Sequence, residues 1–232
     1  MAPPFVDRIA LRNYKSIAAC DLTLGPLTFL VGPNGSGKSN FLDALRLIAD
    51  GLNLPLDHAI RERGGIDDVR RRSTGHPHNV GIRLELRVPP DGSKAAFAFE
   101  IAAKKNGAFE IKEERCWVSE ADYLIEGGVV RKCTLSKPPR ASPDRLYLTN
   151  LSGVEEFRPL YDALTAMSFY SLNPQQIREV QPPDPGRLLA RDGRNLAGVL
   201  GRLQRDAPDR VDRINEYLED NAIFKGAAVF PV

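Results

Sequence analysis

The sequence lacks several features that mark common classes of protein. It has only three cysteines in 232 residues, and Cys20, Cys116 and Cys133 lie far apart, which argues against a disulfide framework or a zinc site. The formal net charge is only +2, so the chain as a whole makes no electrostatic case for binding nucleic acid. No apolar run approaches the ~20 residues of a membrane span, and the first residues lack the apolar core of a signal peptide. We therefore expect a cytoplasmic protein with reduced thiols and no membrane partner.

One stretch points to a specific chemistry. Residues 32–39, Gly-Pro-Asn-Gly-Ser-Gly-Lys-Ser, fit the pattern G-x-x-x-x-G-K-[ST] of a phosphate-binding P-loop. Leu27 to Val31 has the pattern of a short buried strand, and Lys38 to about Asp50 has that of a helix. Strand, glycine-rich turn and helix follow in the order that the motif requires. The alternative is a glycine-rich turn before an ordinary helix.

A P-loop binds phosphate for local physical reasons. Its glycines let successive backbone N–H groups converge on one point, and the following helix directs its free N–H groups at the same point. We expect Lys38 to reach the β and γ phosphates and the Ser39 hydroxyl to ligate Mg²⁺, with ATP and Mg²⁺ as the cofactors. The predicted nucleotide-binding residues here are Gly32, Pro33, Asn34, Gly35, Ser36, Gly37, Lys38, Ser39 and Asn40.

The rest of the chain separates into a sheet-forming part and a helical part. Alternating patterns predict strands at 6–13, 17–24, 80–88, 94–103 and 109–119 and a hairpin within 123–134, while 51–79 is predicted to be irregular. A short strand is expected at Met167 to Leu172, and helices from Val154, at 195–205 and at 208–218. We therefore predict a P-loop lobe with an antiparallel sheet at 1–135, a loop at 136–153, and a strand and helical section at 154–232.

Two blocks of sequence resemble a known group. Leu11-Arg12-Asn13-Tyr14-Lys15-Ser16-Ile17, and residues 27–45 around the P-loop, are similar to the opening of an ABC/SMC-type ATPase head, most of all the RecF-like AAA-family ATPases of bacteria. Residues 169–174 and 192–197 are also similar to this group. The resemblance runs from about residue 7 to about 220, and only the P-loop block is highly specific.

The resemblance implies a head of two lobes, which dimerises by sandwiching two ATP molecules. It places Lys15 and Ser16 near the base and phosphates, and Gln175 or Gln176 on Mg²⁺ and the attacking water. A plain surface turn at Lys15 and Ser16, and a solvated loop at the two glutamines, remain alternatives. It also implies an acidic strand end with a catalytic Glu in the second lobe.

The chain departs from the group at that point. No run of four hydrophobic residues is followed by Asp-Glu, so no catalytic residue is assigned. The sequence ends at Phe230-Pro231-Val232, about where the second lobe of such a head should begin. We expect an α/β P-loop NTPase of ABC/SMC head type, with antiparallel strands, a P-loop helix, a helical C-terminal section and no second lobe.

Three weaker signals have ordinary explanations. Leu151-Ser152-Gly153 is similar to the start of an ABC signature, but Val154 follows it and no acidic strand end comes after, so a loop before a helix is the preferred interpretation. Arg61, Arg63 and the run 70–72 form a basic cluster, either a solvated face or a contact with DNA phosphates or with a nucleotide across a dimer. His76 and His78 lack a third ligand for a metal.

Three functions follow from these observations. The leading hypothesis is the ATP-binding portion of an ABC/SMC-type ATPase, which uses MgATP to drive head dimerisation and gate a DNA or nuclease partner, and which hydrolyses ATP only if a second lobe completes it. The second is a nucleotide-binding scaffold without hydrolysis. The third is a P-loop kinase or GTPase, which the strands before the loop and the absence of an Asn-Lys-x-Asp motif disfavour.

Overall fold

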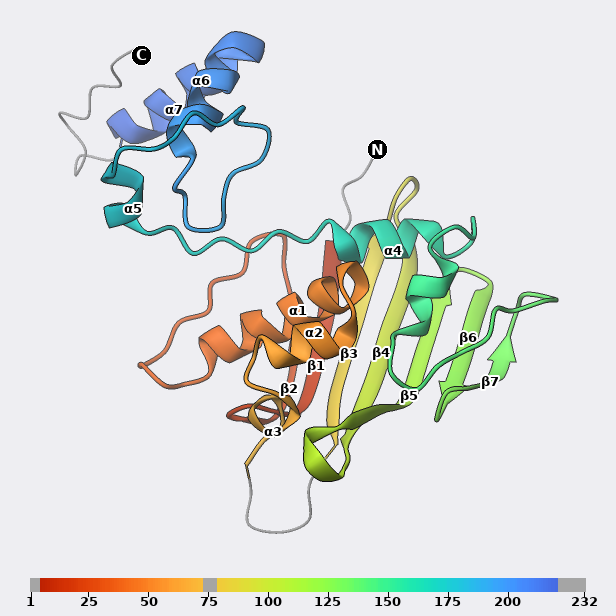
Figure 1. Ribbon diagram of the computed structural model, residues 1–232. Coiled ribbons are helices and arrows are strands. Elements are labelled where there is room, and N and C mark those ends of the chain that lie inside the picture. The colour runs from red at the N-terminus through yellow and green to blue at the C-terminus, as the bar shows by residue number, and fades with distance from the viewer. Residues whose placement is uncertain (1–4, 73–78, 221–232) are drawn as a thin grey trace. The chain divides into compact units, whose positions relative to one another are not determined.

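The computed structural model describes residues 5–72 and 79–220, and the chain divides into two compact units, Met1–Met167 and Ser168–Val232 (Figure 1). The sequence predicts a boundary at the loop 136–153, whereas the first unit ends at Met167. The reason is that the segment after that loop packs back onto the P-loop helix. Asn53 Nδ2 donates to Thr165 O at 3.3 Å, and Tyr161 Oη donates to Leu52 O at 3.4 Å.

A seven-stranded sheet forms the framework of the first unit. All neighbouring strands are antiparallel, and the order is β2-β1-β3-β4-β5-β6-β7. The fold class and the predicted antiparallel strands are thereby confirmed. The strands are β1 (Phe5–Tyr14), β2 (Ile17–Thr23), β3 (Val80–Val88), β4 (Ser93–Ala103), β5 (Phe109–Val118), β6 (Ala121–Glu126) and β7 (Val129–Cys133).

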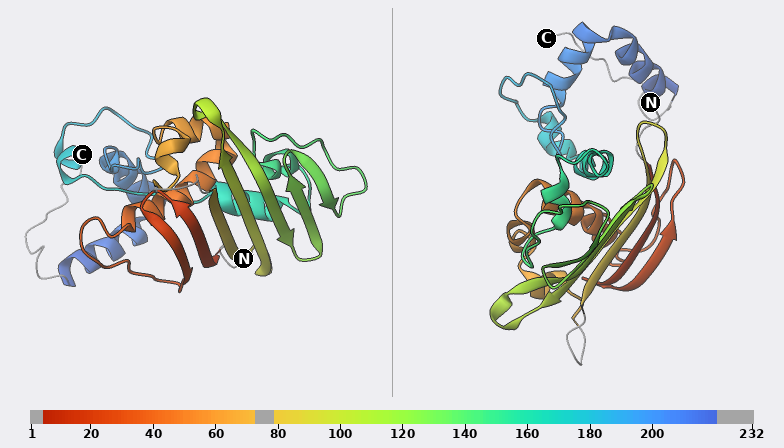
Figure 2. Two further views of the ribbon diagram at one scale, coloured as in Figure 1. Left: turned by 90° about the horizontal axis from the view of Figure 1, so that it is seen from below. Right: turned by 90° about the vertical axis from the view of Figure 1, so that its right-hand side faces the viewer.

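Helices cover one face of this sheet (Figure 2). Alternate residues of β3 are buried toward them, as the period of two in its sequence predicts. The P-loop helix α1 buries one apolar stripe that includes Phe41, Leu45 and Ile48. The helical elements of this unit are α1 (Lys38–Asn53), α2 (Leu56–Arg61), α3 (Ile66–Val69), α4 (Arg158–Thr165) and the 3-10 helices η1 (Lys105–Gly107) and η2 (Tyr147–Leu151).

The prediction that 51–79 is irregular was wrong for the part that the structure describes. Helices α2 and α3 occupy much of it, and Pro55, Gly64 and Gly65 lie at the ends of these helices. Pro55 is the N-cap of α2, and Gly64 and Gly65 take φ values of 92° and 95° between the two helices. These residues therefore separate short helices instead of preventing them.

The prediction of a buried strand at Leu27 to Val31 was also wrong. Leu27, Phe29 and Val31 are 74%, 77% and 91% exposed, and no strand of the described residues pairs with them. The apolar residues favour a strand, but a strand also needs a neighbour to pair with. Residues 168–172 likewise form no strand, and Ser171 N donates to Arg191 O in a loop contact at 2.8 Å.

The second unit is helical, with α5 (Pro174–Arg178), α6 (Leu196–Asp206) and α7 (Pro208–Asp220). The two predicted C-terminal helices are confirmed. Two glycines let a loop lie against α6: a Cβ added to Gly186 would lie 2.1 Å from Gly198 O, and one added to Gly198 would lie 2.7 Å from Asp184 O. Across the described residues of the chain, no helix has the length and apolarity needed to cross a membrane.

Candidate nucleotide-binding site

Two glycines of the P-loop take backbone conformations that favour glycine. Gly35 and Gly37 take φ values of 82° and 95°, which strain any residue with a Cβ atom. Gly37 is the N-cap of α1 and provides no side-chain cap, and the first backbone bond of the helix runs from Phe41 N to Gly37 O at 2.9 Å. The N–H groups of the first turn therefore have no side-chain cap and remain free to bind an anion.

The two residues that end the motif lie at the start of α1. Lys38 Nζ donates to Gly32 O and Pro33 O, each at 2.8 Å, so its ammonium group lies over the loop. Ser39 is exposed in the same first turn. The helix begins at Lys38 as predicted, which places both side chains beside the loop.

The turn between β1 and β2 lies beside the P-loop. Asn40 Nδ2 donates to Ser16 Oγ at 2.7 Å, and a Cβ added to Gly37 would lie 3.4 Å from the same oxygen. Lys15, the neighbour of Ser16 in this turn, has a left-handed backbone with φ 47°. The structure thus brings Lys15 and Ser16 together with the P-loop residues, although more than 20 positions separate Ser16 from Asn40.

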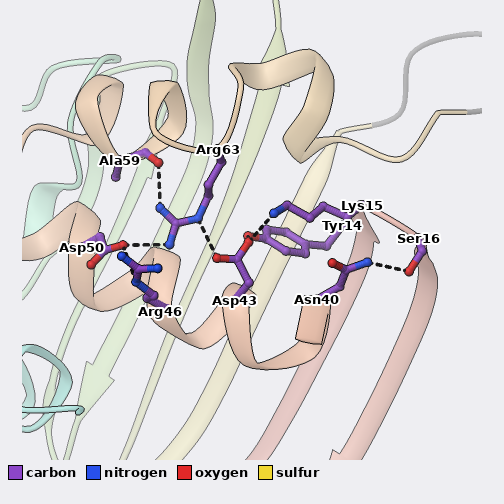
Figure 3. Close-up of polar contacts among 9 residues, drawn as sticks. All are labelled: Tyr14, Lys15, Ser16, Asn40, Asp43, Arg46, Asp50, Ala59 and Arg63. Carbon is purple, nitrogen blue, oxygen red and sulfur yellow. Dashed lines mark hydrogen bonds and ion pairs between the residues drawn. The ribbon is translucent and has the colours of Figure 1, made fainter. Parts of the chain in front are cut away.

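Asp43 of α1 links this turn to the P-loop helix (Figure 3). Its carboxylate accepts from Tyr14 Oη at 2.8 Å and from Arg63 Nε at 3.1 Å, and it lies 2.6 Å from Lys15 Nζ. Burial alone would raise the pKa of Asp43, but the hydrogen bonds from Lys15 and Tyr14 and the charge of Arg63 hold that pKa below its ordinary value. Asp43 is therefore a carboxylate anion at neutral pH.

Arg63, which follows α2, completes this network. Its side chain is only 5% exposed, and it donates to Asp50 Oδ2 at 2.8 Å and to Ala59 O at 2.7 Å. Arg46 also pairs with Asp50, at 3.4 Å. Arg63 was grouped by sequence with the exposed arginines, but the structure makes it a buried link between α1 and α2. Asp43 and Asp50 are seven residues apart, so the sequence places them on one face of the helix. This spacing was the only sign that a buried cation pairs with them.

An open basic pocket of about 570 Å³ lies beside this network. Arg70 pairs with Asp67 at 2.7 Å and Arg72 pairs with Asp68, whereas Arg71 has no ion pair within the described part of the chain. The volume is within the range of small-molecule sites, ~300–1,000 Å³. The residues that line the pocket are Lys15, Ser16, Arg63, Asp68, Arg70, Arg71 and Arg72.

The remaining predicted residues lie elsewhere. Gln175 and Gln176 are on α5 in the second unit, so their assignment as metal ligands stays a prediction. Leu151 is buried as the last residue of η2, ahead of α4. His76 and His78 lie outside the described residues. Among the residues that are described, no three His, Cys, Asp or Glu side chains gather as a metal site.

Sequence reasoning missed one buried carboxyl group, Glu114 on β5. Its oxygens accept from Tyr123 Oη at 2.6 Å, Tyr147 N at 2.6 Å and Leu148 N at 3.0 Å. Burial raises the pKa of Glu114 to about 7, and the three hydrogen bonds only partly oppose this. Glu114 thus joins β5 and β6 to η2, and it is not among the residues that line the basic pocket.

Comparison with known proteins gives several matches. The family model described as "AAA domain, putative AbiEii toxin, Type IV TA system" matches residues 27–214. The DNA replication and repair protein RecF of Magnetococcus marinus is 47% identical over 83 residues, which are 35% of this chain and 22% of that protein. The OLD nuclease of Thermus scotoductus is 46% identical over 43 residues, which are 18% of this chain and 8% of that protein. The matches therefore span less than a quarter of these relatives.

A solved structure described as "Structure of the recombination mediator protein RecF-ATP in RecFOR pathway" is 14% identical and has a TM-score of 0.39. The alignment covers 96% of this chain and 46% of that chain. A TM-score this low supports no statement by itself, whereas the family model covers most of the sequence. The chain therefore belongs to this AAA-domain family, and over about a third of its length it is similar to RecF.

Proposed function

We propose that this chain is the nucleotide-binding part of an ABC/SMC-type ATPase and that it binds MgATP at the P-loop. The observation that carries the proposal is the geometry of residues 32–39: a glycine-rich loop, a helix N-terminus without a side-chain cap, and Lys38 lying over the loop. This arrangement combines converging N–H groups, the positive end of a helix dipole and a cation at one point.

Each binding residue has a distinct part in this proposal. The N–H groups of residues 34–39 and the Lys38 ammonium would hold the phosphates, and Ser39 would hold Mg²⁺. The basic pocket beside Lys15 and Ser16 would take the rest of the nucleotide, since it adjoins the P-loop through the contact between Ser16 and Asn40.

The proposal extends to the assembly of the protein and to its partners. We propose that MgATP drives dimerisation of two heads and gates a partner linked to nucleic acid, such as DNA or a nuclease. The relatives are named as a DNA replication and repair protein and as a nuclease, which supports this class of partner. The exposed apolar residues Leu27, Phe29 and Val31 support a further sheet that would complete the head. One of Gln175 and Gln176 would then touch Mg²⁺.

A scaffold that binds ATP without hydrolysing it is the second candidate. It is favoured because the sequence offers no acidic strand end to orient the attacking water. Turnover by this chain that Lys38→Ala abolishes would exclude the scaffold, whereas the first candidate requires hydrolysis only when a second lobe is present. A kinase or GTPase would show phosphate transfer to a small acceptor, or equal binding of ATP and GTP.

Calorimetric titration with ATP, with and without Mg²⁺, tests the proposal. Lys38→Ala should weaken binding by about 100-fold, because a charge-assisted contact with phosphate is lost, while the unfolding transition stays unchanged. Ser39→Ala should weaken binding with Mg²⁺ more than binding without it. Binding of ATP that is indifferent to Lys38→Ala would refute the placement of the nucleotide, and equal losses with and without Mg²⁺ would remove Ser39 as the metal ligand.

A further inference from the structure

Two lysines border the proposed phosphate site, and they are held in different ways. Lys38 Nζ contacts the carbonyl oxygens of its own loop, Gly32 O and Pro33 O. Lys15 comes from the β1–β2 turn, lies in the basic pocket, and is 2.6 Å from a carboxylate of the P-loop helix, that of Asp43 (Figure 3). The position of Lys15 therefore depends on a residue of α1 and not on the turn alone.

Asp43 is itself held rigidly. Tyr14, which donates to it, is fully buried, and Arg63, which also donates to it, has a side chain only 5% exposed. The side chain of Lys15 is 25% exposed and is the freest of the three partners. A fixed carboxylate thus confines a long side chain that would otherwise sample many rotamers.

The network carries one more positive charge than negative charges, and that extra charge is on Lys15. Asp43 and Asp50 are balanced by Arg63 and Arg46, which pair with them on the same face of α1. Lys15 adds one positive charge that these four residues do not require for neutrality. An anion in the adjoining pocket would balance that charge, so the network is suited to a phosphate ligand.

We propose that Asp43 is a positioning residue, which holds Lys15 where its ammonium group contacts a phosphate of the bound nucleotide. This inference rests on the proposed function, because the ligand is the same nucleotide. Asp43 does not touch the ligand in this proposal and acts only through Lys15.

The direction in which Asp43→Asn changes the affinity for ATP separates the positioning role from a purely electrostatic effect of the Asp43 charge. Asp43→Asn removes a negative charge close to an anion site, so the field alone predicts tighter binding of ATP. Loss of positioning predicts weaker binding, because Lys15 must then be ordered when the ligand binds. The two effects have opposite directions, and one affinity measurement distinguishes them.

The experiment measures the affinity of the full chain for MgATP at one fixed ionic strength. Asp43→Asn should weaken binding about tenfold, close to the loss caused by Lys15→Met. The matched control is Asp50→Asn, which makes the same charge change on the same helix without touching Lys15, and which should stay within about twofold of the parent chain. The double variant of Lys15 and Asp43 should bind no more weakly than Lys15→Met alone.

Asp43→Glu provides a second variant that keeps the charge. It displaces the carboxylate by one methylene and should weaken binding severalfold, again only when Lys15 is present. Unfolding by urea, followed through Trp117, verifies that each variant is folded before its affinity is compared.

Three results would overturn the inference. If the affinity of Asp43→Asn for MgATP equals or exceeds that of the parent chain, Asp43 acts only through its charge and does not position Lys15. A loss that persists in full in the Lys15→Met background would make its role purely structural. If the parent chain showed no ATP binding that depends on Lys38, the proposed function would fail and this inference with it.

Discussion

Glu114 gives the sharpest test of the fold, because its carboxyl group is buried and has no ion pair with any residue that the structure describes. Its side chain is 1% exposed, and its partners are one tyrosine hydroxyl and two backbone N–H groups. These donors favour the carboxylate, but burial disfavours it more, so the pKa rises from its ordinary value of 4.5 to about 7. The folded chain therefore binds a proton at this group that the unfolded chain releases.

The difference in the pKa of Glu114 between the folded and unfolded states sets the direction in which stability changes with pH. Between pH 4.5 and about 7 the folded state holds more protons on Glu114 than the unfolded state does. The free energy of unfolding should consequently fall as the pH rises through this window, and level off above it. At ~1.4 kcal/mol for each unit of pKa, this rise corresponds to a loss of ~3 kcal/mol by pH 8.

Glu114→Gln isolates this contribution from the other titrating groups. Glutamine is uncharged like the protonated acid, but its Nε2 cannot accept the hydrogen bond that one carboxyl oxygen accepts, so the variant carries a stability offset that does not change with pH. Between pH 5 and pH 8 the variant should gain up to ~3 kcal/mol relative to the parent chain, because it carries no buried charge. Urea unfolding between pH 5 and 8.5, followed by the fluorescence of Trp117, measures the difference, since Trp117 lies on the same strand and is the only tryptophan.

Two outcomes would refute this reasoning. Parallel pH profiles for the two proteins would mean that Glu114 does not titrate in this window. A stability difference that shifts in favour of the parent chain as the pH rises would mean that the three hydrogen bonds outweigh the cost of burial and that the pKa lies below 4.5.

Three further predictions follow from particular contacts. Arg63→Met should lower the free energy of unfolding by ~3 kcal/mol in the Trp117 assay, because two part-buried carboxylates lose their shared cation. Gly186→Ala should disrupt the second unit, seen as faster amide exchange in α6, because its Cβ would overlap Gly198 O, and the Trp117 transition should not move. Burial raises the pKa of the Cys116 thiol well above its ordinary range, so only the other two cysteines should react with a thiol reagent before unfolding.

The sheet could be predicted from the sequence because its strands carry their own pattern. In β3 every second residue is buried, and this alternation is visible in the letters. The P-loop was equally predictable, because its glycines and the lysine at the start of the helix all lie within eight consecutive residues, 32–39. The network behind it was not, because Tyr14, Asp43 and Arg63 come from three separate elements and meet only in the folded chain.

Glu114 escaped prediction for a different reason. In β5 the buried positions are Ile111, Glu114, Cys116 and Val118, so the alternation changes phase between the first two. The register of β4 with β5 shifts at the same place, since Glu100 pairs with Glu113 while Ile101 pairs with Ile111. A β-bulge therefore turns Glu114 inward, and a strict period of two would have placed it on the opposite face from Ile111.

The exposed run at Leu27 to Val31 shows what a local pattern can and cannot determine. Its residues are apolar at both odd and even positions, which is typical of a strand buried on both faces of a parallel sheet. In the structure it forms no strand, Leu27, Phe29 and Val31 are exposed, and it leads directly into Gly32 of the P-loop. The pattern indicates that the segment is suited to a strand, while strand formation depends on a pairing partner that a single segment cannot encode. A partner that pairs with this run would also fix the backbone that enters the phosphate site, so sheet completion and nucleotide affinity should rise together.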